Sequence, residues 1–474
     1  MAGLFPSLLL LLVPLSLTAL AEASPSSTHD KFLPDKIARE LAGYQDVVEQ
    51  IVDYAVNGPG QNQSYDRLAT FTDAFGSRLS GTQNLENSID YMLEYLRKDG
   101  LDNVHGEDVN VTRWLRNQES ARLVEPRDYV IAISSLGSSV GTPEEGILAY
   151  AIVVRSFDEL VTRMDEVTGK IVVFNQDYEG YPKSAIYRVA SASRAAEFGA
   201  VATLIRSVAP FSIHSVHTGI QFYNESLPKI PTACITIEDA EMLYRMEQRG
   251  TRLRIQLIMG AENLNMTRSR NTVAEITGSV YPEQVVVVSG HIDSWDVGQG
   301  AMDDGGGVFI SWQALTTVRA LGLKPKRTLR LVLWTDEEAG GVGSQQYYDA
   351  HKTEAGNYSV LLESDEGVFT PYGMEFTGSG AAMMVMEGIG KLLPEFLNSS
   401  VIYAGGGGTD VGWWRASGVP TGSIANHNEH YFYFHHSDGD TMTVLDPHQM
   451  DLCSAVWTAF AYVLADMDDL LPRD

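Results

Sequence analysis

The chain has 474 residues, 44% of them hydrophobic, and a formal net charge of −27 at pH 7. This length suits two or three packed domains. Acidic surfaces repel the phosphates of nucleic acids and anionic lipids, so both are excluded as favoured partners, and solubility alone explains the charge.

A secretory signal is predicted at the N-terminus. Residues 1–21 hold a short apolar run followed by small residues that suit cleavage, although no Lys or Arg precedes the run. A membrane anchor is the weaker interpretation because prolines interrupt this stretch. We therefore expect a secreted protein, or one held in the lysosome, Golgi or endoplasmic reticulum. Six N-x-S/T sequons behind the signal favour glycosylation at Asn62, Asn110, Asn224, Asn265, Asn357 and Asn398.

The next part of the chain is predicted to be helical. Residues 22–43 are polar, and we expect them to be a linker or a removable prosegment. Apolar residues then recur with helical spacing in residues 44–54 and 85–96. We assign residues 44–124 to the N-terminal part of a catalytic domain.

Residues 125–262 have a different pattern. Short β-rich runs such as GKIVVFN and IPTACITI alternate with loops, which predicts a small inserted domain of mixed β/α structure. His214 and His217 lie in a predicted loop without ligand spacing, so we do not expect them to bind metal. Cys234 in this region and Cys453 in the last helix are predicted to be buried free thiols rather than a disulfide.

Residues 263–474 alternate strands and helices. Runs such as QVVVVSG and TLRLVLWT are nearly continuous apolar strands, typical of parallel strands buried on both faces. Residues 302–321 and 343–350, and a last helix from Pro447, are predicted to cross between or cover the strands. The sequence therefore predicts an α/β fold with a largely parallel central sheet flanked by helices. Ligands in such folds lie at the carboxyl ends of the strands.

Four strings in this last part end predicted strands with metal-ligand side chains. They are GHIDSWDVGQGAMDDGGG, LVLWTDEEAGGVGS, LLESDEG and FHHSDGDT. Each string alone has a plain structural explanation, such as a helix cap or a solvated acidic loop. Together they offer imidazoles and carboxylates without a thiolate, which suits zinc, with manganese or cobalt as alternatives.

The first of these strings offers a ligand and a bridge. His291 directly follows a strand, and Asp293 is placed to orient its ring. Asp303 has two carboxylate oxygens and can bridge two cations. Asp304 would then cap the following helix or pack behind the site.

The second and third strings offer carboxylates. Glu337 and Glu338 are adjacent, and neighbouring residues in extended backbone point in different directions. One of them can bind metal while the other acts as a general base on a metal-bound water. Asp365 ends the next strand, with Glu363 and Glu366 as nearby rivals.

The last string offers either His435 or His436 as the final ligand. Asp440 is available there as a buried supporting carboxylate. Two histidines and three carboxylates, each after a buried strand, favour a metal site over separate structural roles.

These strings resemble the motifs of the co-catalytic zinc aminopeptidase and carboxypeptidase family. Its pattern H-x-D, G-A-x-D-[DN]-G, E-E-x-G-x-x-G-S, a strand-end Asp and H-[ST]-x-x-D is met in this order. The resemblance selects His436 over His435 and implies two Zn²⁺ per chain. It implies one zinc on His291 and Asp365, the other on Glu338 and His436, and a bridge at Asp303.

The same resemblance implies further roles. Glu337 becomes the general base, and Asp293, Asp304 and Asp440 become supporting residues. The peptide bond between Asp303 and Asp304 is expected to be cis. Thr409 and Asp410, in the string GGGGTDVGWW, resemble a loop near the substrate pocket. Asp336 is a local difference that we do not expect to matter.

The resemblance covers nearly all of the mature chain, including FGSRLSGTQNLE near its start. The inserted region looks like a protease-associated domain, on a di-zinc exopeptidase fold. The resemblance implies a secreted, homodimeric dipeptidase, expressed as a zymogen, that cleaves dipeptides and short peptides with free termini.

Three alternatives remain. An aminopeptidase acting on longer peptides is the nearest, because no spacing shows which end of the peptide is recognised. A non-catalytic ectodomain that serves as a binding module on the same fold is disfavoured because all six candidate positions are present. A single-zinc acyl transferase of the glutaminyl-cyclase kind is disfavoured by the bridging Asp303 and by both histidines.

Overall fold

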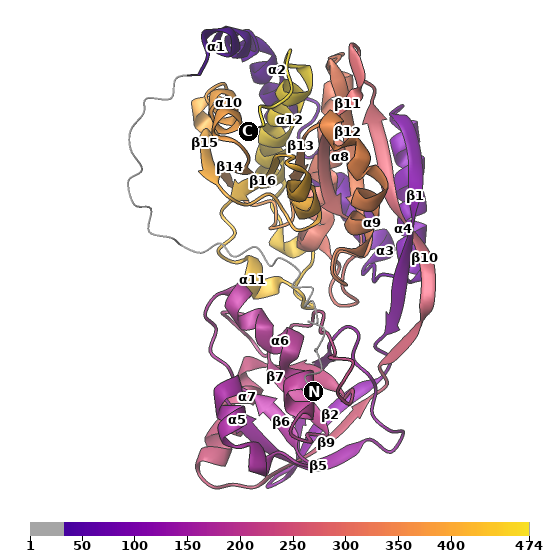
Figure 1. Cartoon of the computed structure of the whole chain (residues 1–474), viewed down its shortest axis with the longest axis vertical. Helices are drawn as coiled ribbons and strands as arrows, with labels where there is room; N and C mark the ends of the chain where they lie inside the picture. The colour runs from indigo at the N-terminus through magenta and orange to yellow at the C-terminus, as the bar shows by residue number, and fades with distance from the viewer. Residues whose placement is uncertain (1–32, 474) are drawn as a thin grey trace, which may run out of the picture.

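The computed structural model describes residues 33–473 (Figure 1). The predicted signal, residues 1–21, lies outside the described residues. Two bodies are seen, each built on an eight-stranded sheet. The chain leaves the larger body after β1 and returns to it through β10, and these two long strands pair antiparallel along one side of the molecule (Figure 1).

The larger body has the strand order β1-β10-β12-β11-β13-β16-β14-β15. The four central strands β12, β11, β13 and β16 are mutually parallel. This confirms the predicted α/β fold with a largely parallel central sheet. The strands are β1 Asp102–Leu115, β10 Glu262–Ile276, β11 Tyr281–His291, β12 Arg327–Trp334, β13 Tyr358–Glu363, β14 Pro371–Thr377, β15 Val401–Ala404 and β16 Thr421–Asn426.

Helices cover both faces of this sheet because its central strands are apolar on both sides. In β12, Leu331 and Leu333 belong to one core, whereas Val332 and Trp334 belong to the core on the opposite face. The longest helix, α12, packs with α2, α3 and α8 in the larger core. The helices are α1 Asp35–Ala42, α2 Gln45–Val56, α3 Gln63–Phe75, α4 Gln83–Lys98, α8 Gly306–Ala320, α9 Val342–His351, α10 Gly380–Gly390, α11 Tyr431–Phe434 and α12 Pro447–Asp466.

The smaller body is formed by residues 119–259, from the start of β2 to the end of β9, and is called the inserted module below. Its strand order is β3-β2-β9-β5-β6-β7-β8-β4. The strands are β2 Glu119–Glu125, β3 Tyr129–Ile131, β4 Ile133–Ser135, β5 Ile147–Val154, β6 Ile171–Phe174, β7 Ala202–Arg206, β8 Thr232–Ile235 and β9 Leu253–Met259. Its helices are α5 Phe157–Thr162, α6 Tyr181–Ala196 and α7 Ile237–Gln248. The two faces of this sheet carry separate cores.

The stretch expected to be a linker or prosegment contains a helix. Helix α1 buries Leu41 in the main core, and Lys36 forms an ion pair of 2.7 Å with Asp469. The stretch is polar overall because one face of this short helix carries the apolar side chains and the other is exposed. Residues 35–42 are therefore part of the folded body.

The state of the two cysteines was predicted correctly, whereas two elements of the larger body were not predicted. Cys234 and Cys453 are buried free thiols, as expected. Helix α3 and the long strand β1 were not predicted from the sequence.

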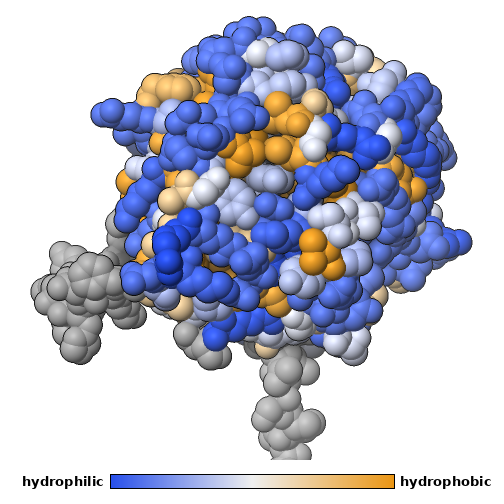
Figure 2. Space-filling view, turned by 90° about the horizontal axis from the view of Figure 1, so that it is seen from above, coloured by the Kyte–Doolittle hydropathy of each residue, from blue (hydrophilic) through white to orange (hydrophobic). Residues whose placement is uncertain are grey.

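Within residues 33–473, no helix combines the length and the hydropathy that a membrane crossing needs. Seen from above, the molecule is largely hydrophilic, with its hydrophobic residues gathered in small areas (Figure 2).

Candidate metal centre

The candidate ligands follow three neighbouring strands of the main sheet. His291 is the last residue of β11, Glu338 lies just past β12, and Asp365 lies just past β13. These strands are adjacent and parallel, so their carboxyl ends meet at one edge. The sheet order therefore brings together side chains that are up to 74 residues apart in the chain.

Asp303 lies at the centre of the site. Its Oδ1 is 3.2 Å from His291 Nε2, which is also 3.1 Å from Asp365 Oδ1. Its Oδ2 is 3.3 Å from His436 Nε2, which in turn is 2.9 Å from Glu338 Oε2. The two oxygens of one carboxylate thus face two separate groups of ligand atoms. This is the arrangement that two neighbouring cations require.

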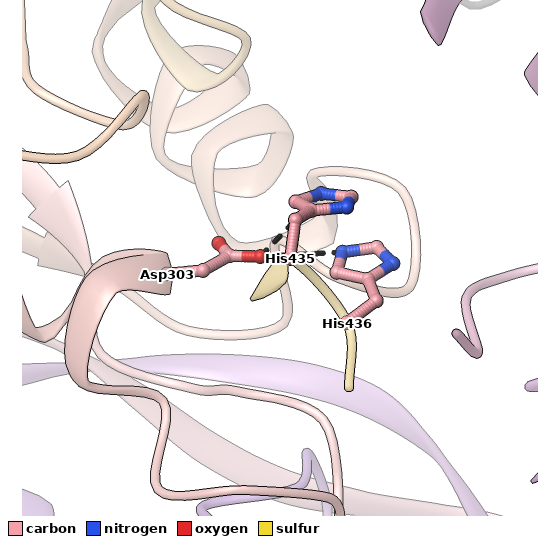
Figure 3. A group of neighbouring side chains, drawn as sticks. All are labelled: Asp303, His435 and His436. Atoms are coloured by element: carbon pink, nitrogen blue, oxygen red, sulfur yellow. Dashed lines mark ion pairs between the residues drawn. The ribbon is translucent and has the colours of Figure 1, made fainter. Parts of the chain in front are cut away.

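Both histidines of the last string point towards Asp303 (Figure 3). His435 Nε2 lies 3.5 Å from Asp303 Oδ2, and its ring stacks on that of His436 with centroids 3.5 Å apart. Of the two histidines, His436 also contacts Glu338, with its Nε2 2.9 Å from Glu338 Oε2. The geometry thus favours His436 as a ligand and leaves His435 beside it.

The donor set fits zinc. It consists of imidazoles and carboxylates without a thiolate. Burial raises the pKa of Glu337 and of Glu338 well above that of an ordinary glutamic acid, and the charge of Asp303 adds to the effect at Glu338. Asp303 Oδ2 is buried and accepts no hydrogen bond from residues 33–473. Positive charge would stabilise these crowded carboxylates in their ionised form.

Two buried carboxylates hold the segment that carries Asp303. Asp440 accepts hydrogen bonds from the backbone N–H groups of Ala301, Met302 and Asp303 at 3.1, 2.7 and 3.2 Å. Asp304 accepts from the N–H of His291 and of Gly307, both at 3.0 Å. It therefore both caps α8 and supports the site. The Asp303–Asp304 peptide bond is cis.

Asp293 supports the site differently from what the sequence suggested. The backbone carbonyl of Asp293 is 3.0 Å from His291 Nδ1, whereas its carboxylate is 3.8 Å away. The carboxylate instead accepts the N–H groups of Glu337 and Glu338, at 3.1 and 3.3 Å. The expected contact to the ring is made by the main chain because the side chain is already used to position the two glutamates.

Thr409 and Asp410 do not line the pocket beside Asp303. Thr409 is exposed. Asp410 is buried, and its N–H donates to Glu363 Oε2 at 3.0 Å, so Glu363 holds this loop. Burial raises the pKa of Asp410 to about 7. The pocket is lined by Ser294, Trp295, Val297, Gly300, Asp303, Glu338, His436, Ser437 and Asp440.

The inserted module also reaches the site, which the sequence did not indicate. His217 Nδ1 lies 2.6 Å from the carbonyl oxygen of His435, and Thr218 N–H donates to that of His436 at 2.8 Å. Arg188 Nη1 is 3.4 Å from His436 Nδ1. These residues are more than 200 positions away in the chain, and no local pattern marks them. His214, by contrast, lies 3.5 Å from Asp239 within the module.

Comparison with known proteins points in one direction. Residues 271–461 match the model described as peptidase family M28. Carboxypeptidase Q of Mus musculus is 56% identical over 438 residues, which cover 92% of this chain and 93% of the relative. The crystal structure of a peptidase M28 precursor from Shewanella amazonensis is 31% identical, with a TM-score of 0.85, and covers 91% of this chain and 99% of that chain. A zinc aminopeptidase from Bacillus subtilis is 17% identical, with a TM-score of 0.64 over 86% of this chain and 98% of that chain, which shows a common fold.

Proposed function

The chain belongs to peptidase family M28 and is a metallo-exopeptidase, and we propose that it is a secreted di-zinc dipeptidase. Its substrates would be dipeptides and short peptides with free termini. The observation that carries the proposal is the position of Asp303, whose two oxygens face two groups of ligand atoms. The proposed zinc ligands are His291 and Asp365 on one side, Glu338 and His436 on the other, and Asp303 between them.

Two bound zinc ions would lower the pKa of a shared water and polarise the peptide carbonyl. Glu337 is proposed as the general base that takes the proton from this water. The backbone N–H of Glu337 donates to the Asp293 carboxylate at 3.1 Å. The same carboxylate accepts the N–H of the proposed ligand Glu338. The water oxygen bonds to the carbonyl carbon, the carbon–nitrogen bond breaks, and Glu337 passes its proton to the leaving amine.

Small substrates are supported by the walls of the pocket. Trp295 lines it and lies 5.7 Å from the His436 ring, and the inserted module lies behind His435 and His436. We infer that the inserted module limits the room for a long peptide more than the room for a dipeptide.

A secreted, glycosylated form is supported by the accessibility of the sequons. Asn62, Asn110, Asn224, Asn265 and Asn398 are exposed, and Asn357 is half-buried. The proposal also includes a homodimer and passage through the secretory pathway. Both rest on the resemblance to the family's dipeptidases.

The function is tested with a panel of peptides. The purified protein is incubated with a dipeptide, its N-acetylated and C-amidated forms, and a pentapeptide, each with and without a chelator. We expect cleavage of the free dipeptide, little cleavage of the blocked forms, and loss of activity that zinc restores. Faster removal of the first residue from the pentapeptide than cleavage of the dipeptide would identify an aminopeptidase instead.

A further inference from the structure

We propose that the inserted module completes the metal centre, by positioning His436 through His217, Thr218 and Arg188. This inference rests on the proposed zinc site, in which His436 is a ligand. It makes the module a working part of the active site and not only a neighbour in the fold. The contacts that carry it lie where α6 and α11 approach each other (Figure 1).

Two hydrogen bonds fix the backbone at the ligand. His217 Nδ1–H donates to the carbonyl of His435 at 2.6 Å, and Thr218 N–H donates to the carbonyl of His436 at 2.8 Å. His436 has a φ of 59°, in the left-handed region that side-chain-bearing residues seldom adopt. A strained backbone of this kind persists where its surroundings hold it. Here both bonds come from the inserted module.

The ring of His436 is oriented from the same side. Its Nε2 faces Glu338 and Asp303, so its Nδ1 is turned towards the module, 3.3 Å from the carbonyl oxygen of Thr218. An Nδ1–H that donates to this carbonyl leaves the lone pair of Nε2 free for a cation. Metal-binding histidines are usually held by such a partner on their second nitrogen.

Arg188 holds the carbonyl of Thr218, which in turn orients the ring of His436. Its Nη1 donates to Thr218 O at 3.2 Å, and its Nη2 donates to the hydroxyl of Tyr181 at 2.7 Å. Arg188 and Thr218 are both buried. The guanidinium lies against Gly219, where an added Cβ would be only 2.3 Å from Arg188 Cζ. Glycine at this position is therefore what lets the arginine reach the site.

The contacting loop is anchored in the module's own sheet. His217 N–H donates to Ser207 Oγ at 2.9 Å, just past β7. Thr218 Oγ1 donates to the carbonyl of Ser135, the last residue of β4, at 2.8 Å. The position of His436 is thus tied to the sheet of the inserted module.

The test measures zinc binding to the full-length protein by equilibrium dialysis in zinc buffers. His217→Leu removes the bond to His435, whereas His217→Asn keeps an N–H donor near the place of Nδ1. We expect His217→Leu to weaken one of the two zincs by about 10–100-fold, the usual effect of losing a partner behind a ligand. His217→Asn should stay close to the wild type, and the second zinc should be unchanged in both.

A second pair of variants tests Arg188 through its packing. Gly219→Ala places a methyl group against the guanidinium. Gly180→Ala is the matched control, since Gly180 also has a positive φ, of 88°, but nothing lies within 4 Å of its added Cβ. Gly219→Ala should weaken the same zinc and change the visible spectrum of the cobalt-substituted enzyme, and Gly180→Ala should do neither.

The outcomes separate this inference from the proposed function. One zinc in the wild-type protein would contradict the di-zinc proposal, and the variants would then be judged on that single zinc. Wild-type zinc affinity and cobalt spectra in folded His217→Leu and Gly219→Ala would overturn the inference. If His217→Leu does not fold, the glycine pair decides.

Discussion

At the scale of single residues, the division of work between adjacent side chains decides the chemistry. Glu337 and Glu338 follow the same strand, and Asp293 holds both of their N–H groups. Glu338 Oε2 lies 2.9 Å from His436 Nε2. We therefore propose that Glu337 acts on the water.

Replacing Glu337 with glutamine tests this division. The amide keeps the shape of the side chain but cannot take a proton. We expect both zincs to be retained and kcat for a dipeptide to fall by about 10²–10⁴-fold, the usual contribution of a general base. Metal analysis and steady-state kinetics check this. Near-normal turnover with a full metal content would reject Glu337 as the base.

A buried carboxyl on α12 gives a pH-dependent prediction. Asp451 accepts the N–H of Asn62 at 2.8 Å, and burial raises its pKa to about 7. Because this pKa is higher in the folded protein than in the unfolded chain, the stability it contributes is present below about pH 4. That stability is lost as the pH rises to 7.

Asp451→Asn removes this titration but keeps the acceptor oxygen. We expect its melting temperature to exceed that of the wild type by about 1–2 °C at pH 8, and the difference to disappear near pH 4. Thermal unfolding at several pH values measures this. An equal difference at all pH values would contradict the assigned cause.

At the scale of the elements, parallel strands explain why much of the site could be predicted. The strands that end at His291 and shortly before Glu338 and Asp365 are apolar on both faces, and this marks them as central. Side chains after such strands meet at one edge of the sheet. The segment that carries Asp303 is held by a further residue, Asp440. This residue lies 137 positions later in the sequence.

The support of this segment by Asp440 is itself testable. Asp440→Ala removes three acceptor contacts from residues 301–303. We expect zinc affinity or activity to fall by about 10–100-fold. The matched control is Asp438→Ala, which changes an exposed carboxylate two residues away. Equal loss in both variants would mean that Asp440 has no particular role.

At the scale of the whole molecule, the sequence could not show how the two bodies meet. The patterns in residues 125–262 indicated an inserted β-rich unit, but His217 is 218 positions from the residue it contacts. Contacts of this kind depend on the placement of whole sheets, which local patterns do not encode. The short helix α1 was also missed, because its eight residues are polar on average, although one face of the helix is apolar.

We propose that Asp303 joins two zinc ions in one site. The most direct measurement is the zinc content per chain of the purified wild-type protein and of Asp303→Ala, by elemental analysis after dialysis. We expect two zincs in the wild type and none retained in the variant, because each zinc loses a ligand oxygen to the same substitution. Two zincs in the folded variant, or a single zinc in the wild type, would contradict it.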